Sequence, residues 1–348
     1  MFELWFAIVA VMFTLYFVLD GYDFGAGALH LIVARNNEER RTVLAAIGPF
    51  WDANEVWLLA AGGALFVAFP RVLAAGLSGF YLAIFLVVWC LLLRAIAVEF
   101  RSHVLEPLWR GFWDVTFAVA STLLPVLFGA ALGNLVRGVP LNADGWFQLP
   151  FFTTFLPRDP AGILDWFTVL AGVFALIALA GHGATFLAWR TQGTVHERSR
   201  RLVLVLYAAV AVLWPLVTLA THVVSPALLP ALPDQPFAWL GLVLAVAGIV
   251  TVFAATTRGR TLAAFLGSCA FLAGVLVATA ACTFPVMLRA LGDPALSITA
   301  HGAGANPEGL RTALNWWMIG FPLAALYFFT LFRIHRGKAV PAGEGEGY

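Results

Sequence analysis

The stretch LWFAIVAVMFTLYFVLDGYDFGAGALHLIV, residues 4–33, decides the fold class. It is long enough to cross a membrane as a helix, because about 20 apolar residues rising 1.5 Å each span the hydrocarbon core. Eight further stretches meet the same criterion. The nine predicted spans are roughly 4–33, 42–70, 73–98, 113–137, 163–189, 202–229, 236–256, 261–288 and 312–334. The sequence therefore predicts an all-α, polytopic membrane protein with about nine transmembrane helices.

The composition of the whole chain agrees with this class. Of its 348 residues, 61% are hydrophobic and 11% are charged, whereas an ordinary soluble domain carries about 25% charged residues. So few charged side chains cannot cover the surface of a soluble globule, and this excludes a soluble enzyme. A formal net charge of +1, with no basic run, also excludes nucleic acid as a partner.

The basic residues of the loops predict the orientation of the chain. An odd number of spans places the two termini on opposite sides of the membrane, and cytoplasmic loops carry an excess of Lys and Arg. With the N-terminus outside, the inner side holds 15 of the 20 basic residues: Arg35, Arg40, Arg41, Arg94, Arg101, Arg110, Arg190, Arg198, Arg200, Arg201, Arg258, Arg260, Arg333, Arg336 and Lys338. The outer side keeps Arg71, Arg137, Arg158, Arg289 and Arg311. We therefore expect an N-out, C-in topology.

No soluble domain or linker divides the chain, so we expect one integral membrane domain over residues 1–348. Gly25, Gly27 and Ala28 near the end of the first span are echoed by Gly181, Gly183 and Ala184 near the end of the fifth. This echo fits two four-helix units, residues 1–137 and 163–288, followed by a ninth helix at 312–334. Chance explains the echo equally well, because glycines and inner arginines recur in proteins of this class.

Four acidic residues fall well inside predicted spans rather than at their ends, and a carboxylate at such a depth costs roughly 2.5–3.5 kcal/mol. Asp20 and Asp23 are three residues apart on the first span, and Asp52 and Glu55 are three apart on the second. Residues with this spacing lie on one face of a helix. Because of their cost, such acids normally face the protein interior and serve a purpose.

The depth of these acids in the membrane can also be predicted. Asp23 lies ten residues before the inner end of its span at Val33, and Asp52 lies ten residues after the inner end of the next span at Thr42. Both would therefore lie about 15 Å from the inner boundary. One interpretation is a proton path or cation site reached from the cytoplasm. The other is a set of hydrogen bonds between helices that only fixes their packing.

Two other charged positions have structural interpretations. Arg94 lies near the inner end of the third predicted span, together with Glu99, and its side chain would reach the surface or pair with a carboxylate. Asp114 is expected to begin the fourth span, where a carboxylate suits the positive end of the helix dipole.

Histidine and cysteine patterns predict no haem or metal on this chain. Of the seven histidines, His30, His182 and His222 could lie in the membrane, and none has a matching histidine at like depth on a neighbouring span. No CxxCH or HxxxH spacing occurs. The three cysteines (Cys90, Cys269 and Cys282) lie in apolar stretches and are expected to pack as small hydrophobic residues.

Two segments of the sequence are distinctive: DGYDFGAG at residues 20–27 and IGPFWDANEVWL at residues 47–58. They resemble the corresponding segments of subunit II of the cytochrome bd-type quinol oxidases. The similarity extends along most of the chain and is looser in its second half. Further matching segments include Ser78-Gly79-Phe80-Tyr81, Arg94 with Glu99-Phe100-Arg101, Trp113-Asp114 and Gly133-Asn134.

The resemblance implies one half of a heterodimeric terminal oxidase in the respiratory chain of the bacterial inner membrane. Such an enzyme oxidises ubiquinol and reduces oxygen to water. In that family two b-type haems, one d-type haem and the quinol-oxidising loop belong to subunit I, so this chain would be the haem-free partner. It would support the oxygen-reducing haem site and supply a cytoplasmic proton path. Small accessory transmembrane subunits, lipid and quinone are further expected partners, and the cyanide-insensitive branch is one subtype that fits.

The resemblance also implies roles for single residues. Asp52 matches the family acid assigned to proton delivery, and Glu55 would extend that path, although some relatives carry glutamine there. Asp23 matches an acid tied to the integrity of the haem site. Supporting roles are expected for Asp20, Asn54, Trp57, Arg94 and Glu99. The alternatives are a proton- or cation-coupled transporter that uses the same four acids, and an assembly partner without chemistry.

Overall fold

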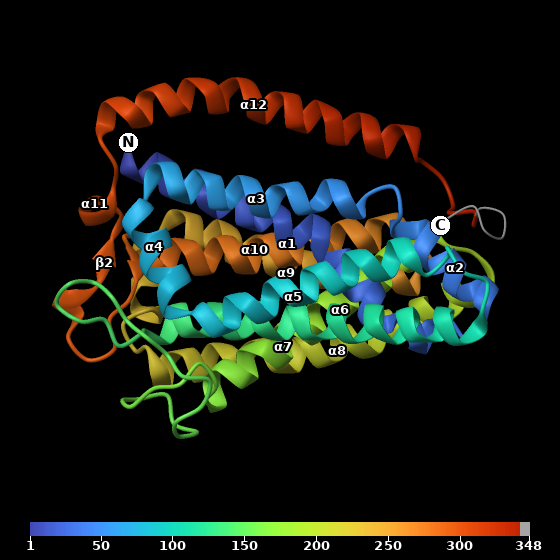
Figure 1. The fold of residues 1–348 in the computed structure, drawn as a ribbon, viewed down its shortest axis with the longest axis horizontal. Coiled ribbons are helices and arrows are strands. Elements are labelled where there is room, and N and C mark those ends of the chain that lie inside the picture. The colour runs from blue at the N-terminus through green and yellow to red at the C-terminus, as the bar shows by residue number, and fades with distance from the viewer. Residues whose placement is uncertain (342–348) are drawn as a thin grey trace.

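The computed structural model describes residues 1–341. Its long helices run side by side along one axis, and the two ends of the chain lie at opposite ends of the bundle (Figure 1). The long helices are α1 (Phe2–Val33), α5 (Tyr81–Phe100), α6 (Pro107–Arg137), α7 (Trp166–Arg190), α8 (Gly193–Val224), α9 (Pro236–Thr257), α10 (Thr261–Thr283) and α12 (Pro307–Ile334). The shorter elements are α2 (Asn37–Ile47), α3 (Trp51–Ala68), α4 (Pro70–Gly79), η1 (Leu229–Asp234), β1 (Val286–Leu288), η2 (Pro294–Leu296), β2 (Ile298–Thr299) and α11 (Ala300–Ala303).

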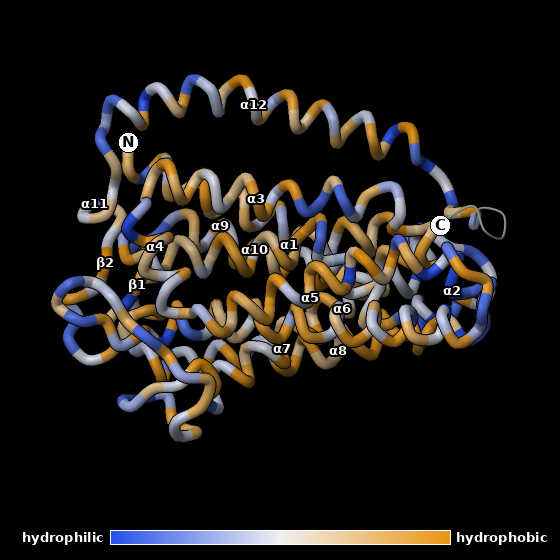
Figure 2. Tube along the Cα trace, viewed as in Figure 1, coloured by the Kyte–Doolittle hydropathy of each residue, from blue (hydrophilic) through white to orange (hydrophobic). Residues whose placement is uncertain are grey.

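The number of spans agrees with the sequence-based prediction. Within residues 1–341, eight helices are long and apolar enough to cross a membrane, and nine if α3 and α4 form one bent span. Hydrophobic residues dominate the middle of the bundle, and hydrophilic residues concentrate in the segments at its two ends (Figure 2). The protein is therefore an all-α, polytopic membrane protein.

The predicted second and third spans are wrong in their boundaries. Residues 42–70 do not form one helix, because α2 ends at Ile47 and α3 begins only at Trp51. Pro49 lies in the intervening turn, and Pro70 occupies the first turn of α4, where its missing N–H costs nothing. The chain bends by 120° between α3 and α4. The third span therefore begins at Tyr81 rather than at residue 73.

Helix α1 lies at the centre of the bundle and contacts α3, α6, α7 and α10. Its approach to α7 is close enough to require glycine on both sides. A Cβ at Gly25 would lie 2.0 Å from the Leu179 carbonyl oxygen and 2.7 Å from the Gly183 Cα. Helix α1 thus contacts helices from both halves of the chain. The division into two four-helix units stays a prediction.

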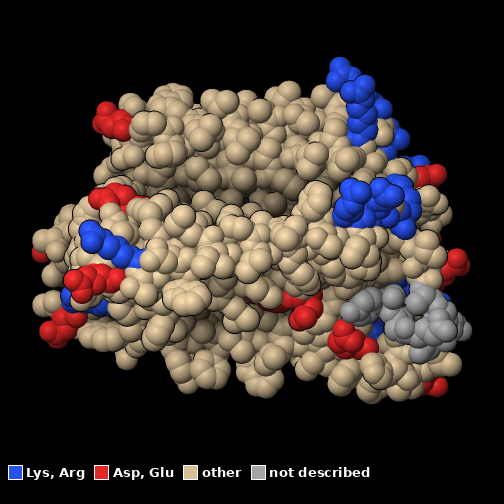
Figure 3. Space-filling model, turned by 90° about the horizontal axis from the view of Figure 1, so that it is seen from above, with Lys and Arg blue, Asp and Glu red and all other residues tan. Residues whose placement is uncertain are grey.

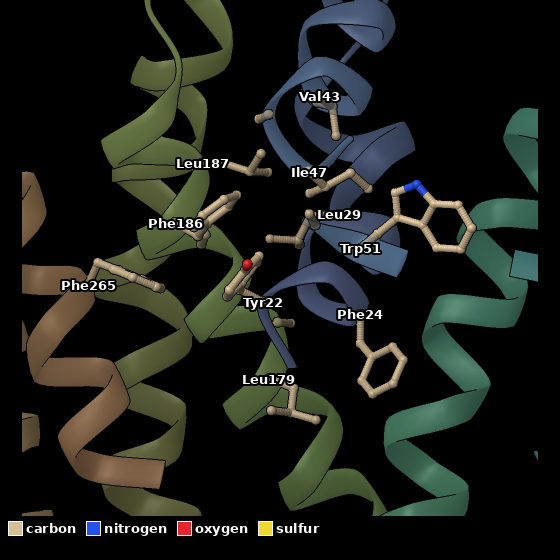
Figure 4. Packing of buried hydrophobic residues seen from close by; sticks show 14 of the residues in the cluster. Tyr22, Phe24, Leu29, Val43, Ile47, Trp51, Leu179, Phe186, Leu187 and Phe265 are labelled. Atoms are coloured by element: carbon tan, nitrogen blue, oxygen red, sulfur yellow. The ribbon is translucent and has the colours of Figure 1, made fainter. Parts of the chain in front are cut away.

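Aromatic packing fills the space between α1, α7 and α10. The ring of Tyr22 stacks on Phe186 with centroids 4.0 Å apart, and Phe265 meets Tyr22 edge-on at 5.8 Å. Figure 4 shows these three side chains converging from their separate helices, with Leu29 and Ile47 above Tyr22. This packing fixes the face that α1 presents to α3 and α5.

The last long helix, α12, runs along the outside of the bundle (Figure 1). It contacts α3, where Trp57 packs against Phe321 and Phe328 with ring centroids 5.9 and 5.5 Å apart. Residues 335–339, here called the C-terminal strap, then return to the end of α7. Arg190 Nη1 donates to the Gly337 carbonyl at 2.6 Å, and the Ala339 N–H donates to the Arg190 carbonyl at 2.7 Å.

We call the end of the bundle that holds α2 and the strap the inner end, and the opposite end the outer end. Basic side chains gather mainly at the inner end, and uncharged side chains cover nearly all of the middle of the face shown in Figure 3. This distribution agrees with the predicted N-out, C-in topology.

Candidate functional site

A buried arginine on α5 joins two carboxylates from two other helices. Arg94 is 1% exposed. Its Nη1 and Nη2 donate to the two carboxylate oxygens of Asp20 on α1, at 2.8 and 3.2 Å. Nη2 also donates to Glu55 on α3. The Phe24 ring lies 4.6 Å from the guanidinium carbon and contributes a cation–π contact. Arg94 therefore pairs with carboxylates inside the bundle rather than reaching the surface.

Asn54 connects a third carboxyl group to this arrangement. Its Nδ2 lies 2.7 Å from Asp23 Oδ2, 2.8 Å from the Tyr22 hydroxyl and 3.2 Å from the Leu19 carbonyl oxygen. An amide has only two N–H groups, so it serves at most two of these three acceptors fully. Within the described structure, Asp23 Oδ1 and Asn54 Oδ1 are buried without a hydrogen-bond partner.

We call Asp20, Asp23, Asn54, Glu55 and Arg94 the carboxyl cluster. Its members come from α1, α3 and α5, and the residues that bond across these helices are 31 to 74 positions apart in the sequence. The cluster contains three carboxyl groups and one guanidinium. Burying several unpaired negative charges is very unfavourable, so the arrangement favours a proton on one of the carboxyl groups. The cluster can therefore hold a proton inside the bundle.

Asp52 does not face the interior of the bundle, although the free-energy cost of a carboxylate in the membrane predicts that it should. It is the second residue of α3 and is exposed, with Val56 and Leu59 on the same side of the helix and 53% and 75% exposed. The expectation rests on the cost of a carboxylate in the membrane alone. Within α3 the buried residues Asn54 and Trp57 mark the face toward the bundle, and Asp52, two residues before Asn54, lies on the opposite side of the helix.

Two other predicted supporting residues lie outside the carboxyl cluster. Trp57 is buried at 5% exposure between α3 and α12, where it holds the last helix against the bundle. Glu99 is exposed near the inner end of α5. It lies five residues beyond Arg94, or about 7 Å along the helix axis. Trp57 and Glu99 therefore contribute to helix packing and to the inner surface.

A second buried ion cluster at the inner end was missed by the sequence analysis. Asp114 on α6 accepts hydrogen bonds from Arg101 Nε at 2.6 Å and from Arg40 Nη1 at 2.9 Å. It also accepts one from His30 Nε2 on α1, at 2.7 Å. The expected role at a helix start is wrong, because α6 begins at Pro107 and Asp114 is its eighth residue. From the sequence, residues 107–112 are expected to form a loop because they include the charged Arg110.

A similar ion pair closes the outer end. Arg137, the last residue of α6, pairs with Asp165, which caps the start of α7 by accepting from the Phe167 and Thr168 N–H groups. Arg137 Nη2 also donates to the Asn134 side chain at 2.7 Å. Asp165 belongs to a predicted span. An Asp followed three residues later by Thr168 is a helix-capping pattern, and this pattern could have predicted its role from the sequence.

The two buried histidines differ in how their ring nitrogens are used. Both ring nitrogens of His182 have partners, with Nε2 lying 2.8 Å from the Val18 carbonyl and Nδ1 lying 2.7 Å from the Ser268 hydroxyl. His30 Nε2 binds Asp114 and its ring meets the Phe117 ring edge-on at 5.3 Å, whereas its Nδ1 has no hydrogen-bond partner in the described structure. Across residues 1–341, no group of three or more His, Cys, Asp or Glu side chains is placed to hold a metal ion.

Comparisons with known proteins identify the family. Residues 1–335 match the family model described as cytochrome bd terminal oxidase subunit II. Cytochrome bd-I ubiquinol oxidase subunit 2 of Escherichia coli K12 is 41% identical over 197 residues, which are 57% of this chain and 51% of that protein. The match thus spans about half the length of this relative. A probable cytochrome oxidase subunit 2 of Haemophilus influenzae is 31% identical over 350 residues, covering 93% of this chain and 91% of that protein.

The fold agrees with this result. A chain in the solved structure of bd oxidase from Geobacillus thermodenitrificans superposes with a TM-score of 0.73 at 16% identity, covering 96% of this chain and 98% of that one. The chain is thus a multi-span helical protein of the bacterial inner membrane, and it belongs to the cytochrome bd terminal oxidase subunit II family.

Proposed function

We propose that this chain is the haem-free second subunit of a quinol:oxygen oxidoreductase and that its carboxyl cluster delivers protons. The observation that carries this proposal is the carboxyl cluster, in which the buried Asp20 and Asp23 and the partly buried Glu55 lie together with Arg94, in a chain of this family. The alternative of a proton- or cation-coupled transporter is not favoured by the family match.

The proposed reaction requires protons inside a dry membrane. Reduction of one oxygen molecule to two waters takes four electrons and four protons, and oxidation of two quinols supplies the electrons and releases four protons. Protons reach a site inside the membrane through titratable or hydrogen-bonding groups. A second subunit with a buried, proton-holding cluster is suited to this task.

The positions of Asp52 and Glu55 support access from the inner side. Asp52 is exposed in the first turn of α3, and Glu55 lies about one turn further, where its side chain is 21% exposed. Glu55 pairs with Arg94, which in turn holds Asp20. In this proposal a proton taken up at Asp52 passes to Glu55. Arg94 stays charged and holds the carboxylates of Glu55 and Asp20 close together, so that the proton can move between these two acids without passing through the guanidinium.

The partner in this proposal is a haem-bearing subunit I. The exposed apolar face of α3 beside Asp52 would be covered by this subunit or by lipid, because an apolar surface of this size is unfavourable in water. The haems, two b-type and one d-type, would be held by subunit I, and quinol would be the substrate of the complex. Accessory small subunits are also compatible with the exposed helices.

The proposal is tested on the complex purified from its native membrane through a tag on this chain. We expect a haem-bearing subunit to co-purify, a haem d absorption band and quinol-dependent oxygen uptake. The control is this chain expressed without its partner, which should contain almost no haem. One haem per isolated chain would contradict the haem-free assignment, and a complex without haem d or oxygen uptake would contradict the oxidase function.

A further inference from the structure

A recess of about 560 Å³ opens at the inner end of the bundle, away from the carboxyl cluster. It lies between the end of α7, the start of α10 and the C-terminal strap. Its lining includes Trp189, Arg260, Thr261, Leu262, Leu266 and Lys338. The recess therefore combines polar groups from two chain segments with apolar side chains on α10.

The polar part of the recess has excess positive charge. Arg260 directly precedes α10, and Lys338 in the strap donates to the Trp189 carbonyl at 2.5 Å. Among residues 1–341, no ion pair joins Arg260 or Lys338 to a carboxylate. Burial lowers the pKa of Lys338, and the positive charge of Arg190 lowers this pKa further. An anion at this place would relieve the repulsion and would also meet the positive end of α10.

The apolar part of the recess lies on α10, one of the helices long and apolar enough to cross a membrane. Leu262 and Leu266 are one turn apart on α10 and are 46% and 56% exposed. The Trp189 ring beside them is held in place by stacking on Phe265, with centroids 5.2 Å apart. A ligand that contacts both parts needs a negatively charged head group and an apolar chain.

The position of the recess matches the interface of the inner leaflet. Helix α7 ends at Arg190 and α10 begins at Thr261, so the two cations lie where the spans end. Basic pockets between helices on the cytoplasmic side bind the head groups of anionic lipids. We propose that this recess binds one anionic phospholipid, with its phosphate between Arg260 and Lys338 and an acyl chain along Leu262 and Leu266.

This lipid would connect the strap to the bundle. The strap already contacts α7 through Arg190, and a phosphate shared by Lys338 and Arg260 would add a contact to α10. The free phosphate ion carries the same charge but lacks the acyl chain, so it would leave the leucines on α10 uncovered.

The test measures lipid binding to the purified complex by native mass spectrometry, with dioleoylphosphatidylglycerol and dioleoylphosphatidylcholine as probes. We expect the wild type to prefer phosphatidylglycerol. The double variant Arg260→Gln/Lys338→Gln should bind it about 25-fold more weakly, because each cation near the membrane surface contributes about fivefold. The matched control is Arg201→Gln/Arg333→Gln, which removes two exposed arginines elsewhere at the inner end and should bind like the wild type.

Three results would overturn the proposal. They are equal binding of both lipids by the wild type, an equal loss in the control pair, and displacement of the lipid by millimolar glycerol phosphate as readily as by phosphatidylglycerol. The last result would indicate a site for a free phosphate ester. If the double variant does not assemble, the single variant Arg260→Gln should still show about a fivefold loss, and Arg260→Lys/Lys338→Arg should keep the preference.

Discussion

The guanidinium of Arg94 on α5 faces the carboxylate of Asp20 on α1 with both of its terminal nitrogens, at 2.8 and 3.2 Å. The two side chains are 1% and 0% exposed. In such a buried pair each charge depends on the other, because removing one leaves the second without compensation. The pair therefore fixes the position of α5 relative to α1 and makes the net charge of the carboxyl cluster sensitive to any change at Arg94.

Arg94→Gln is expected to destabilise the protein strongly. The substitution leaves Asp20 and Glu55 without their cation, and breaking a buried ion pair in this way costs about 3–5 kcal/mol. The measurement is thermal unfolding of the purified complex. Arg71→Gln is the control, since Arg71 is exposed and donates to the Asp144 carbonyl at 3.0 Å. Equal shifts of Tm in the two variants would contradict a special role for the Arg94 pair.

Asp52→Asn is expected to slow quinol-dependent oxygen uptake by about tenfold or more, because it removes an exchangeable proton but keeps size and hydrogen bonding. Assembly and haem content should change little, as the side chain is exposed. Asp52→Glu should recover part of the rate, and the exposed outer residue Asp234 provides a control in Asp234→Asn. Full turnover of the Asp52→Asn complex would show that the relay does not need this acid. Equal loss of complex in Asp52→Asn and Asp52→Glu would assign it to packing.

Asp23→Asn is expected to reduce the haem content of the complex more than the amount of this chain in the membrane. The variant still accepts a hydrogen bond from Asn54, so α1 and α3 remain joined, but the acidic proton is lost. The measurement compares the haem d absorbance with the amount of chain detected by immunoblot. Normal haem content together with normal oxygen uptake would refute a role of Asp23 in supporting the haem site.

Gly25→Ala is expected to disrupt the contact between α1 and α7. Its Cβ would lie 2.0 Å from the Leu179 carbonyl oxygen, and backbone atoms cannot move aside as a flexible side chain can. Overpacking of this kind costs about 1–3 kcal/mol or more. Gly62→Ala on α3 is the control, because no atom lies within 4 Å of its added Cβ. That control should unfold at the same temperature or slightly higher, since alanine favours a helix by up to about 1 kcal/mol.

Glu39→Gln is expected to make stability less dependent on acid pH. Burial raises the pKa of Glu39, but hydrogen bonds from Thr194, the Arg35 N–H and Arg198 outweigh this effect and lower the pKa to about 2. The ionised carboxylate therefore stabilises the folded chain above the ordinary pKa of 4.5. This contribution is lost as the pH falls toward 2, and we expect about 1 kcal/mol for it.

The check is the difference in Tm between wild type and Glu39→Gln, measured from pH 6 to pH 3. The difference should be largest at pH 6 and should shrink as the pH is lowered. A difference that does not change with pH would mean that the ionised state of Glu39 contributes nothing to folding.

The spans were predictable from the sequence because an apolar run of sufficient length has few alternatives to a membrane helix. The acids of the carboxyl cluster were predictable for a related reason, since Asp20, Asp23 and Glu55 stand out in an apolar setting. The pairing of Arg94 with two of these acids was left open. Hydrophobic periodicity is nearly absent in helices that are apolar on all sides, so it does not tell which face turns inward.

The two errors in the prediction have different causes. Asp52 is expected to face the interior because a carboxylate in the membrane is costly, whereas in α3 it lies on the side of the helix opposite the buried Asn54. Asp114 is expected at a helix start because the charged and aromatic stretch before it resembles a loop, whereas α6 already begins at Pro107. The second error concerns a helix boundary, where local signals compete with tertiary packing.

The peripheral place of α12 has a consequence for how the protein is made. This helix leaves the ribosome after all the other described helices, and it contacts the rest of the bundle mainly along α3. The partners of Arg94, Asn54 and Asp114 all come from residues that precede it in the chain. The bundle can therefore acquire these buried ion pairs during membrane insertion before α12 emerges, and α12 then closes over α3.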